Sequence, residues 1–214
     1  MSTLKEPCVV DSCGLINCSR ELAGMKILDF LDRVYSLVIP EKVIKELSEI
    51  QRTRKQISLE YINKFIATKK EIVKRIDEYN ECLDVIKRWF EKYGMGRNFA
   101  SFQEGEIHCV ALALYLARTE KRAVTLVTDD FKARRMGIEH FVNLQQVGLV
   151  KSTAEIVVHL YTLIREVGEL HAVAAINDYM RNNPFRWDAK PFFINKLEQS
   201  CRRLGLNLCF SKCL

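Results

Sequence analysis

The chain has 214 residues, of which 48% are hydrophobic and 28% charged, and its formal net charge is +6. This composition is typical of a soluble globular protein that buries a full core in one or two domains. Charged residues interrupt the first 13 positions, and no later stretch is apolar for long enough to span a membrane, so we expect neither a secretory signal nor a membrane partner. The expected location is the cytoplasm, or the nucleus in a eukaryote.

The eight cysteines are expected to be reduced thiols. Disulfides are typical of exported proteins, and the cysteines near the two ends of the chain lack the C-x-x-C spacing of a structural zinc site. We interpret them as small buried residues.

Short apolar runs rich in β-branched residues predict strands at residues 8–10, 35–39, 123–127 and 140–142. Residues with helical periodicity follow each run. Strands that alternate with helices predict an α/β fold with a mainly parallel sheet.

A long amphipathic helical stretch is predicted from residue 41 to residue 93, where there is no Gly or Pro and apolar residues recur at steps of three and four. It is either one rod or a hairpin bent without a breaker. Ser101 and Glu104 have the spacing of a capping box, so a new helix is expected to start near Ser101.

The last quarter of the chain is predicted to be helical. Ser152 or Thr153 is expected to cap a helix that runs to Gly168, followed by helices ending near Arg181 and spanning residues 191–204. We expect a main domain at 1–183 and a helical extension at 184–214.

Carboxylates follow two of the predicted strands. Asp11 comes directly after the run at 8–10, and Asp129 and Asp130 follow the run at 123–127. Active sites of open parallel sheets lie at the carboxyl ends of the strands, so these acids are expected at one edge. Glu46 and Glu106 fall in the first turns of predicted helices, near the stripes that face the core.

Converging carboxylates repel one another unless a cation neutralises them, and hard oxygen ligands favour Mg²⁺ or Mn²⁺ over zinc. Such ions support hydrolysis of phosphodiesters without a nucleophilic side chain. Taken singly, each acid is better explained as a helix cap or a surface ion-pair partner. As an ordered set on the expected elements, the acids favour a metal site.

Four segments together resemble the acidic motifs of the PIN-domain nuclease family, which includes VapC-like ribonucleases: VVDSCGLI from Val9, VIPEKVIKEL from Val38, EGEIHCVALA from Glu104 and LVTDDFKAR from Leu126. The resemblance covers about residues 7–180. It implies a three-layer α/β/α fold and a metal-dependent endoribonuclease that leaves 5′-phosphate and 3′-hydroxyl ends.

Carried over by motif, the resemblance implies that Asp11, Glu46, Glu106 and Asp130 are the catalytic metal ligands. Asp129 is a further ligand, direct or through water, and the sequence does not separate it from Asp130. The hydroxyls of Ser12 and Thr128 are expected to orient the ligands.

The chain departs from a compact family pattern in a predicted basic helical insertion at 51–97. Its residues 51–75 carry eight basic side chains against two acidic ones. These side chains either contact nucleic-acid phosphates or form a solvated helix face, and the sequence does not decide between the two. The candidates are Arg52, Arg54, Lys55, Lys69, Lys70, Lys74 and Arg75.

Three functions remain open at this stage: an endoribonuclease, a nuclease for single-stranded or flapped DNA, and a non-catalytic module that binds nucleic acid or protein. RNA is the expected partner. An inhibitory or scaffolding protein and a homodimer are also compatible with the sequence. The aromatic residues Trp89, Phe90 and Phe99 are expected in the core rather than stacked on bases, and His108 is the histidine nearest to a predicted acid.

Overall fold

The structure is a computed structural model of the whole chain. It describes residues 5–22, 24–53, 58–92, 104–130, 138–164, 166–168, 171, 172, 174, 198, 199 and 202.

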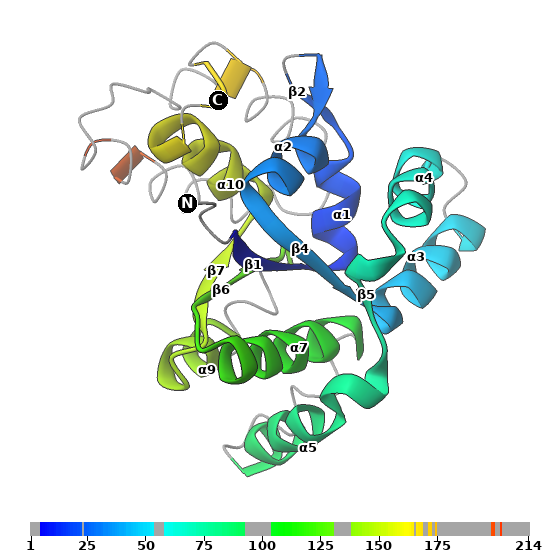
Figure 1. Ribbon diagram of the computed structural model, residues 1–214, viewed down its shortest axis with the longest axis vertical. Coiled ribbons are helices and arrows are strands. Elements are labelled where there is room, and N and C mark those ends of the chain that lie inside the picture. Colours follow the sequence, from blue (N-terminus) through cyan, green and yellow to red (C-terminus); the bar gives the residue numbers. More distant parts are fainter. Residues whose placement is uncertain are drawn as a thin grey trace.

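A five-stranded parallel sheet with the order β5-β4-β1-β6-β7 forms the centre of the molecule (Figure 1). Its strands are β1 (Glu6–Val10), β4 (Tyr35–Pro40), β5 (Val73–Lys74), β6 (Val124–Val127) and β7 (Gly148–Lys151). The inner strands β1, β4 and β6 are almost entirely buried, as expected for a parallel sheet covered on both faces. The prediction of a mainly parallel α/β fold is confirmed.

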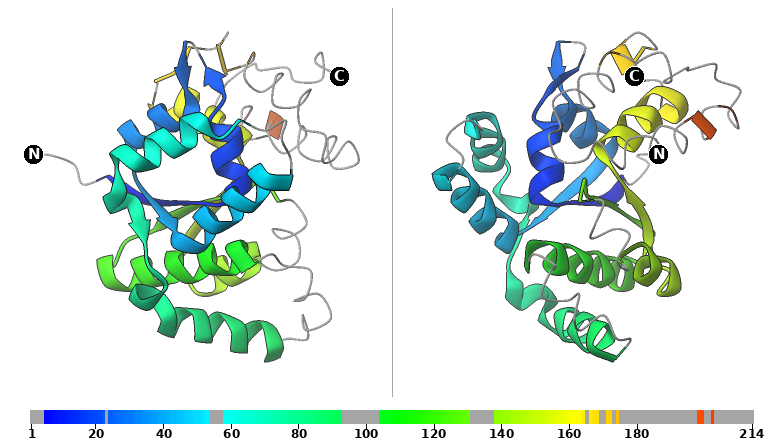
Figure 2. Two further views of the ribbon diagram at one scale, coloured as in Figure 1. Left: turned by 90° about the vertical axis from the view of Figure 1, so that its right-hand side faces the viewer. Right: turned by 180° about the vertical axis from the view of Figure 1, so that it is seen from behind.

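Helices cover both faces of the sheet and give three layers (Figures 1 and 2). On one face lie α1 (Ser12–Cys18), α2 (Ile27–Val34) and α10 (Thr153–His159). On the other face α7 (Glu104–Glu120) packs against β1, β4 and β6, with α9 (Glu139–Leu144) next to the edge strand β7. The long α5 (Ile76–Lys92) packs on the outside of α7.

The predicted strand at 140–142 is wrong, because these residues lie in α9 and the strand is β7 at Gly148–Lys151. Phe141 and Val142 are adjacent and both buried in α9, so in the sequence they resemble part of a short buried strand. Three residues are too few to distinguish a repeat of two from a repeat of 3.6.

The single amphipathic stretch predicted from 41 to 93 is also wrong. The chain forms α3 (Glu41–Thr53), α4 (Glu60–Thr68), the 3₁₀ turn η1 (Lys70–Ile72), strand β5 and then α5. Val73 pairs with Ile39, so β5 is the edge strand of the central sheet. The predicted basic insertion at 51–97 therefore contains an element of the sheet itself, where pairing with β4 overrides local helical periodicity.

A small two-stranded sheet, β2 (Glu21–Leu22) with β3 (Met25–Lys26), was not predicted. The helix expected near Ser101 begins at Glu104 among the described residues, and Ser101 itself lies outside them. Ser152 caps α10 in a capping box with Glu155, as predicted, although the regular helix ends at His159 and continues as the π-helical turn η3 (Leu160–Ile164). The predicted helices after Gly168 lie outside the described residues except at isolated positions.

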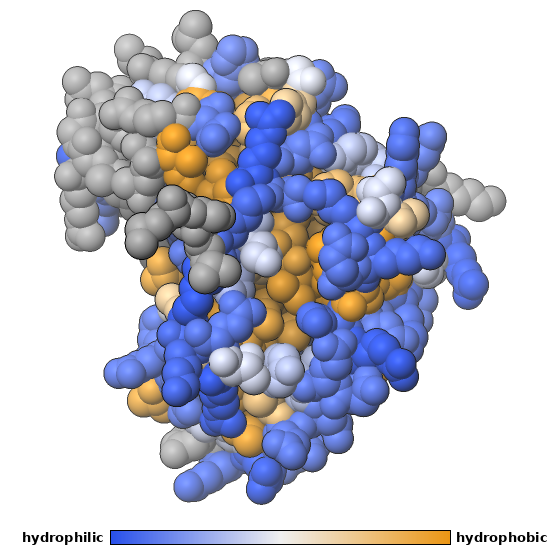
Figure 3. Space-filling view, viewed as in Figure 1, coloured by the Kyte–Doolittle hydropathy of each residue, from blue (hydrophilic) through white to orange (hydrophobic). Residues whose placement is uncertain are grey.

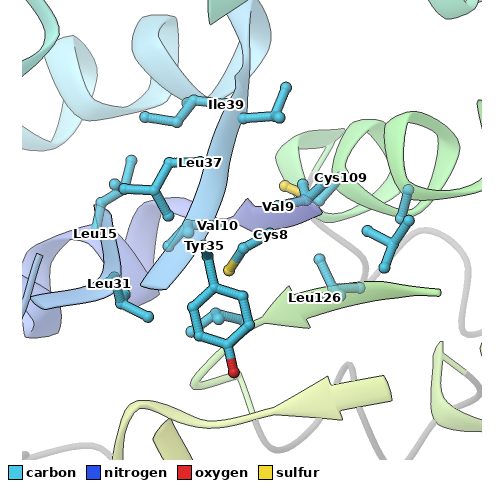
Figure 4. Packing of buried hydrophobic residues seen from close by; sticks show 14 of the residues in the cluster. Cys8, Val9, Val10, Leu15, Leu31, Tyr35, Leu37, Ile39, Cys109 and Leu126 are labelled. Carbon is cyan, nitrogen blue, oxygen red and sulfur yellow. The ribbon is translucent and has the colours of Figure 1, made fainter. Parts of the chain in front are cut away.

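Buried side chains of the strands form one core with those of the covering helices. Figure 4 shows labelled members of this core from β1, β4 and β6, with Cys109 of α7 next to Val9. The described cysteines Cys8, Cys13, Cys18, Cys82 and Cys109 are all free thiols, in agreement with the prediction.

On the face shown in Figure 3, hydrophobic residues gather in the middle, over the strands, and the surrounding helices present mostly hydrophilic ones. In the part of the chain that the structure describes, no helix has both the length and the apolar character needed to cross a membrane.

Candidate active site

Asp11 lies at the carboxyl end of β1, where it caps α1. Its side chain accepts a hydrogen bond from the Gly14 amide at 2.5 Å, and its own amide donates to the Val127 carbonyl at 3.1 Å. The Thr128 hydroxyl also bonds to the Asp11 carboxylate. Because β1 and β6 are paired in parallel register, the residues that follow both strands meet at this edge, as the sequence predicted.

The Asp11 carboxylate is only 3% exposed. Burial raises the pKa of Asp11 from its ordinary value of 3.8 to about 7, against the hydrogen bonds from Thr128 and Gly14, which lower it. The negative charges of Asp129 and Asp130 raise the pKa of Asp11 further. Positive charge brought close to this carboxylate would therefore favour its ionised form.

Glu46 reaches the same region from α3. Its Oε1 accepts a hydrogen bond from the Gly105 amide at 2.7 Å, and the Ser12 side chain bonds to the same carboxylate. Partial burial is the main cause that raises the pKa of Glu46, while these two hydrogen bonds and the charge of Lys42 oppose the shift. Glu46 therefore contacts α1 and the start of α7 at once.

Glu106 lies in the first turn of α7 and is 7% exposed. The charge of Glu106 acts on the thiol of Cys109 together with the charges of two other acids. The pKa of Cys109 is raised first by burial and then by the charges of Asp11, Glu46 and Glu106. The charges of three acids, one directly after β1, one on α3 and one on α7, therefore act on the buried thiol of Cys109.

The thiol of Cys13 on α1 connects the remaining acids to this group. Burial is the largest cause that raises the pKa of Cys13, followed by the charges of Asp11, Asp129, Asp130 and Glu106. The charge of each of the five predicted acids thus acts on at least one of these two thiols. We refer to these five carboxylates, Asp11, Glu46, Glu106, Asp129 and Asp130, as the acidic cluster.

The two aspartates after β6 have different surroundings. The Asp129 carboxylate accepts hydrogen bonds from Asn17 Nδ2 at 2.8 Å, from the Thr153 amide at 2.8 Å and from Thr153 Oγ1 at 2.5 Å. Asp129 thereby joins α1 to the start of α10. The Asp130 amide donates to Thr128 Oγ1 at 3.2 Å, which fixes its backbone next to Asp11.

The chemistry of the acidic cluster fits Mg²⁺ or Mn²⁺, because its donors are carboxylate oxygens and burial raises the pKa of Asp11 and of Glu46. Among the residues that the structure describes, no three His, Cys, Asp or Glu side chains are spaced to hold one ion as they stand. The carboxylates of Asp11, Glu46 and Asp129 instead accept hydrogen bonds from the protein.

Several of the predicted nucleic-acid contacts are ion-paired within the protein. Lys69 pairs with Asp32, Lys74 with Glu78 at 2.9 Å and Arg75 with Asp77 at 3.4 Å.

Arg52 and Lys70 are exposed, whereas Arg54 and Lys55 lie outside the described residues. Lys42 is a cation that does act on the acidic cluster. Its charge lowers the pKa of Glu46, and its ammonium group forms an ion pair with Glu104. Sequence reasoning missed Lys42, although its position four residues before Glu46 on one helix face was a usable signal.

The structure also describes His108 and two of the three aromatic residues that the sequence analysis singled out. His108 is not free for catalysis as placed, because its Nδ1 is 2.9 Å from the Tyr79 hydroxyl, and burial lowers the pKa of His108. Trp89 and Phe90 pack edge to face, and each contacts Phe141 in the core, as predicted. Phe99 lies outside the described residues.

Comparison with known proteins gives one family match. Residues 8–147 match the model of the PIN domain, which covers Asp11, Glu46, Glu106, Asp129 and Asp130. Neither the curated proteins nor the solved structures contain a significant match. The matched segment is well over half of the chain, and the parallel sheet with helices on both faces agrees with it. The chain therefore belongs to the PIN-domain family, whose members are generally nucleases.

Proposed function

We propose that the chain is a Mg²⁺- or Mn²⁺-dependent endoribonuclease in which Asp11, Glu46, Glu106 and Asp130 hold the metal. The observation that supports this most strongly is the placement of the acids at one edge of the sheet: the Asp11 amide bonds to the Val127 carbonyl, two residues before Asp129, and the Glu46 carboxylate bonds to the Gly105 amide, next to Glu106. Gathering buried acids in one place costs stability, and a bound cation offsets that cost. RNA is chosen because the four acidic motifs resemble those of VapC-like ribonucleases.

In this proposal the hydrogen bonds of the protein hold each ligand in place. Thr128 orients Asp11, and Ser12 orients Glu46, so both hydroxyls act through a carboxylate. When bound, Mg²⁺ or Mn²⁺ supplies Lewis acidity and neutralises charge during in-line hydrolysis of a phosphodiester. Asp130 completes the set from a backbone that Thr128 fixes. The chain's own part is to hold ionised, oriented carboxylates around the metal.

The exposed cations Arg52 and Lys70 are proposed to contact the substrate backbone. Arg52 lies on α3, the helix that carries Glu46, and Lys70 lies in η1 beside the edge strand β5. Contacts of this kind bind phosphates without reading bases, and they weaken as the salt concentration rises.

A non-catalytic PIN module is the second candidate. It is favoured by the lack, among the described residues, of three side chains already spaced to hold one ion. In that case the acidic cluster would be a structural network, and the exposed cations would dock nucleic acid or a partner protein.

The deciding experiment is cleavage of end-labelled single-stranded RNA and of DNA of the same sequence, with Mg²⁺, Mn²⁺ or EDTA. The wild type is compared with Asp11→Asn and with Asp84→Asn, a control that removes an exposed carboxylate on α5. We expect metal-dependent cutting of RNA, with 5′-phosphate products, by the wild type and Asp84→Asn alone. Cutting of DNA only would change the substrate class, and binding without cutting by any of the three proteins would favour the non-catalytic module.

A further inference from the structure

Gly105, the second residue of α7, leaves no room for a side chain. A Cβ added there would lie 2.5 Å from Cδ and 2.6 Å from Oε1 of Glu46, and closer still to Oε2. Real Cβ atoms essentially never approach other atoms within 3.0 Å. The carboxylate of Glu46 therefore occupies the space that any other residue at position 105 would need.

The backbone does not require glycine at this position. Gly105 lies in the first turn of a regular helix and has no left-handed φ, unlike Gly24 and Gly148. Glycine is less favourable than alanine inside a helix, so alanine would suit the backbone of α7 better. The atoms that a Cβ would meet belong to the end of the Glu46 side chain, from a different helix, so alanine would require that carboxylate to move.

The same residue also supplies a donor to that carboxylate. The Gly105 amide bonds to Glu46 Oε1 at 2.7 Å, and it is one of the amides at the start of α7 that have no partner within the helix. A hydrogen bond from a helix N-terminus to an ionised carboxylate is stronger than one between neutral groups. Gly105 thus lets the Glu46 carboxylate come close to the backbone of α7 and also donates a hydrogen bond that orients this carboxylate.

A second link between the same two helices lies beside the first. Lys42, one turn before Glu46 on α3, forms an ion pair with Glu104, the residue before Gly105 on α7. From the other side, the Ser12 side chain bonds to Glu46. Contacts from α1 and α7 therefore hold the Glu46 carboxylate in one orientation.

We propose that Gly105 is a positioning residue of the acidic cluster, which sets the place of the Glu46 carboxylate by its amide and by its lack of a side chain. Its effect on cleavage rests on the proposed function, whereas the contact itself does not. Adding a methyl group at position 105 would push the Glu46 carboxylate off the Gly105 amide and out of its present position. Shortening the acid by one methylene would make that methyl group tolerable.

The test is a cycle of Gly105→Ala, Glu46→Asp and the double variant. Gly168→Ala is the control, because among the residues that the structure describes a Cβ at Gly168 would meet only His171 Nδ1, at 3.7 Å. Mn²⁺ affinity without substrate and the kcat and KM for RNA are measured for each. We expect Gly105→Ala to weaken Mn²⁺ binding and to lower kcat by about tenfold or more, with KM changed by less than about twofold. In the background of Glu46→Asp, adding Gly105→Ala should change both by less than about threefold, since the clash is relieved.

An equal loss from Gly105→Ala in both backgrounds would overturn the proposal, and so would a loss equalled by Gly168→Ala. Amide hydrogen exchange in the metal-free protein gives a second measurement that leaves Gly105 unchanged. Replacing its acceptor by Glu46→Ala should speed exchange of the Gly105 amide by about tenfold, and an unchanged rate would show that the bond does not act. If the wild type cuts neither RNA nor DNA, the proposed function fails, but this exchange measurement still decides on the contact.

Discussion

The buried carboxylate of Asp11 predicts that the metal-free protein loses stability as the pH rises. The pKa of Asp11 in the folded protein is raised to about 7, chiefly by burial, from 3.8. Below pH 4 the group is protonated in both the folded and the unfolded states, so it costs nothing. Between about pH 4 and pH 7 only the unfolded state releases the proton, and the free energy of unfolding falls.

The size of this effect follows from the shift. One pKa unit corresponds to about 1.4 kcal/mol, so a shift of about three units costs the folded state on the order of 4 kcal/mol above pH 7. Asp11→Asn removes the charge but keeps an oxygen that can accept from the Gly14 amide, and Asn caps helices as well as Asp does. The variant should therefore be more stable than the wild type at pH 8 in EDTA.

The assay is urea denaturation at several pH values between 4 and 8, in EDTA, for the wild type, Asp11→Asn and the control Asp84→Asn. The quantity to compare is the difference in the free energy of unfolding between the wild type and Asp11→Asn at each pH, because His159 changes the stability of both proteins in the opposite direction. Burial lowers the pKa of His159 to about 4, so only the unfolded state takes up this proton between pH 6.5 and 4, and the free energy of unfolding falls as the pH falls through that range.

A divalent cation should narrow the difference in stability between Asp11→Asn and the wild type. Mn²⁺ at a hundred times its dissociation constant would stabilise the wild type by about 2.7 kcal/mol and leave Asp11→Asn nearly unchanged. Equal stability of the wild type and Asp11→Asn at pH 8 in EDTA would refute the reasoning, since it would mean that the Asp11 charge is already compensated within the protein.

Three more predictions follow from single contacts. Thr153→Val removes a hydroxyl donor to Asp129 and should lower the free energy of unfolding by about 1 to 3 kcal/mol, measured with urea; no change would mean that the other donors suffice. Gly148→Ala would place a Cβ 2.5 Å from the Val124 nitrogen at a φ of +154°, so a loss of about 2 kcal/mol or more is expected in the same assay, and a smaller loss would show that β7 can shift. Glu106→Gln keeps the shape of the side chain and should lower kcat by about a hundredfold or more while the melting temperature stays within a few degrees; normal cleavage would exclude Glu106 as a ligand.

The inner strands of the sheet could be predicted from the sequence because burial on both faces leaves a continuous apolar run, as in residues 8–10 and 124–127. The edge strand β5 could not be predicted. It has two residues, Val73 and Lys74, inside a segment without Gly or Pro, and only its pairing with β4 makes it a strand. Local periodicity carries no information about such a long-range contact.

The acids of the proposed site could be named from their order along the chain, because each follows a strand or lies in the first two turns of a helix. Their partners could not. Asn17 and Thr153 stand on different helices and have no motif of their own, yet both bond to Asp129. Gly105 was part of a quoted motif, but its role depends on a carboxylate 59 positions away in the chain.

The segment after the matched PIN region belongs to the same site. The match ends at residue 147, and β7 begins at Gly148 and pairs with all four residues of β6. The Thr128 amide donates to the Lys151 carbonyl at 2.9 Å, so β7 also fixes the residue that orients Asp11. Two residues after Lys151, the amide and the hydroxyl of Thr153 both donate hydrogen bonds to the Asp129 carboxylate. Since Asp129 is anchored by α10 and Asp130 is the next residue, the placement of the fourth acid depends on a strand and a helix that lie beyond the four acidic motifs.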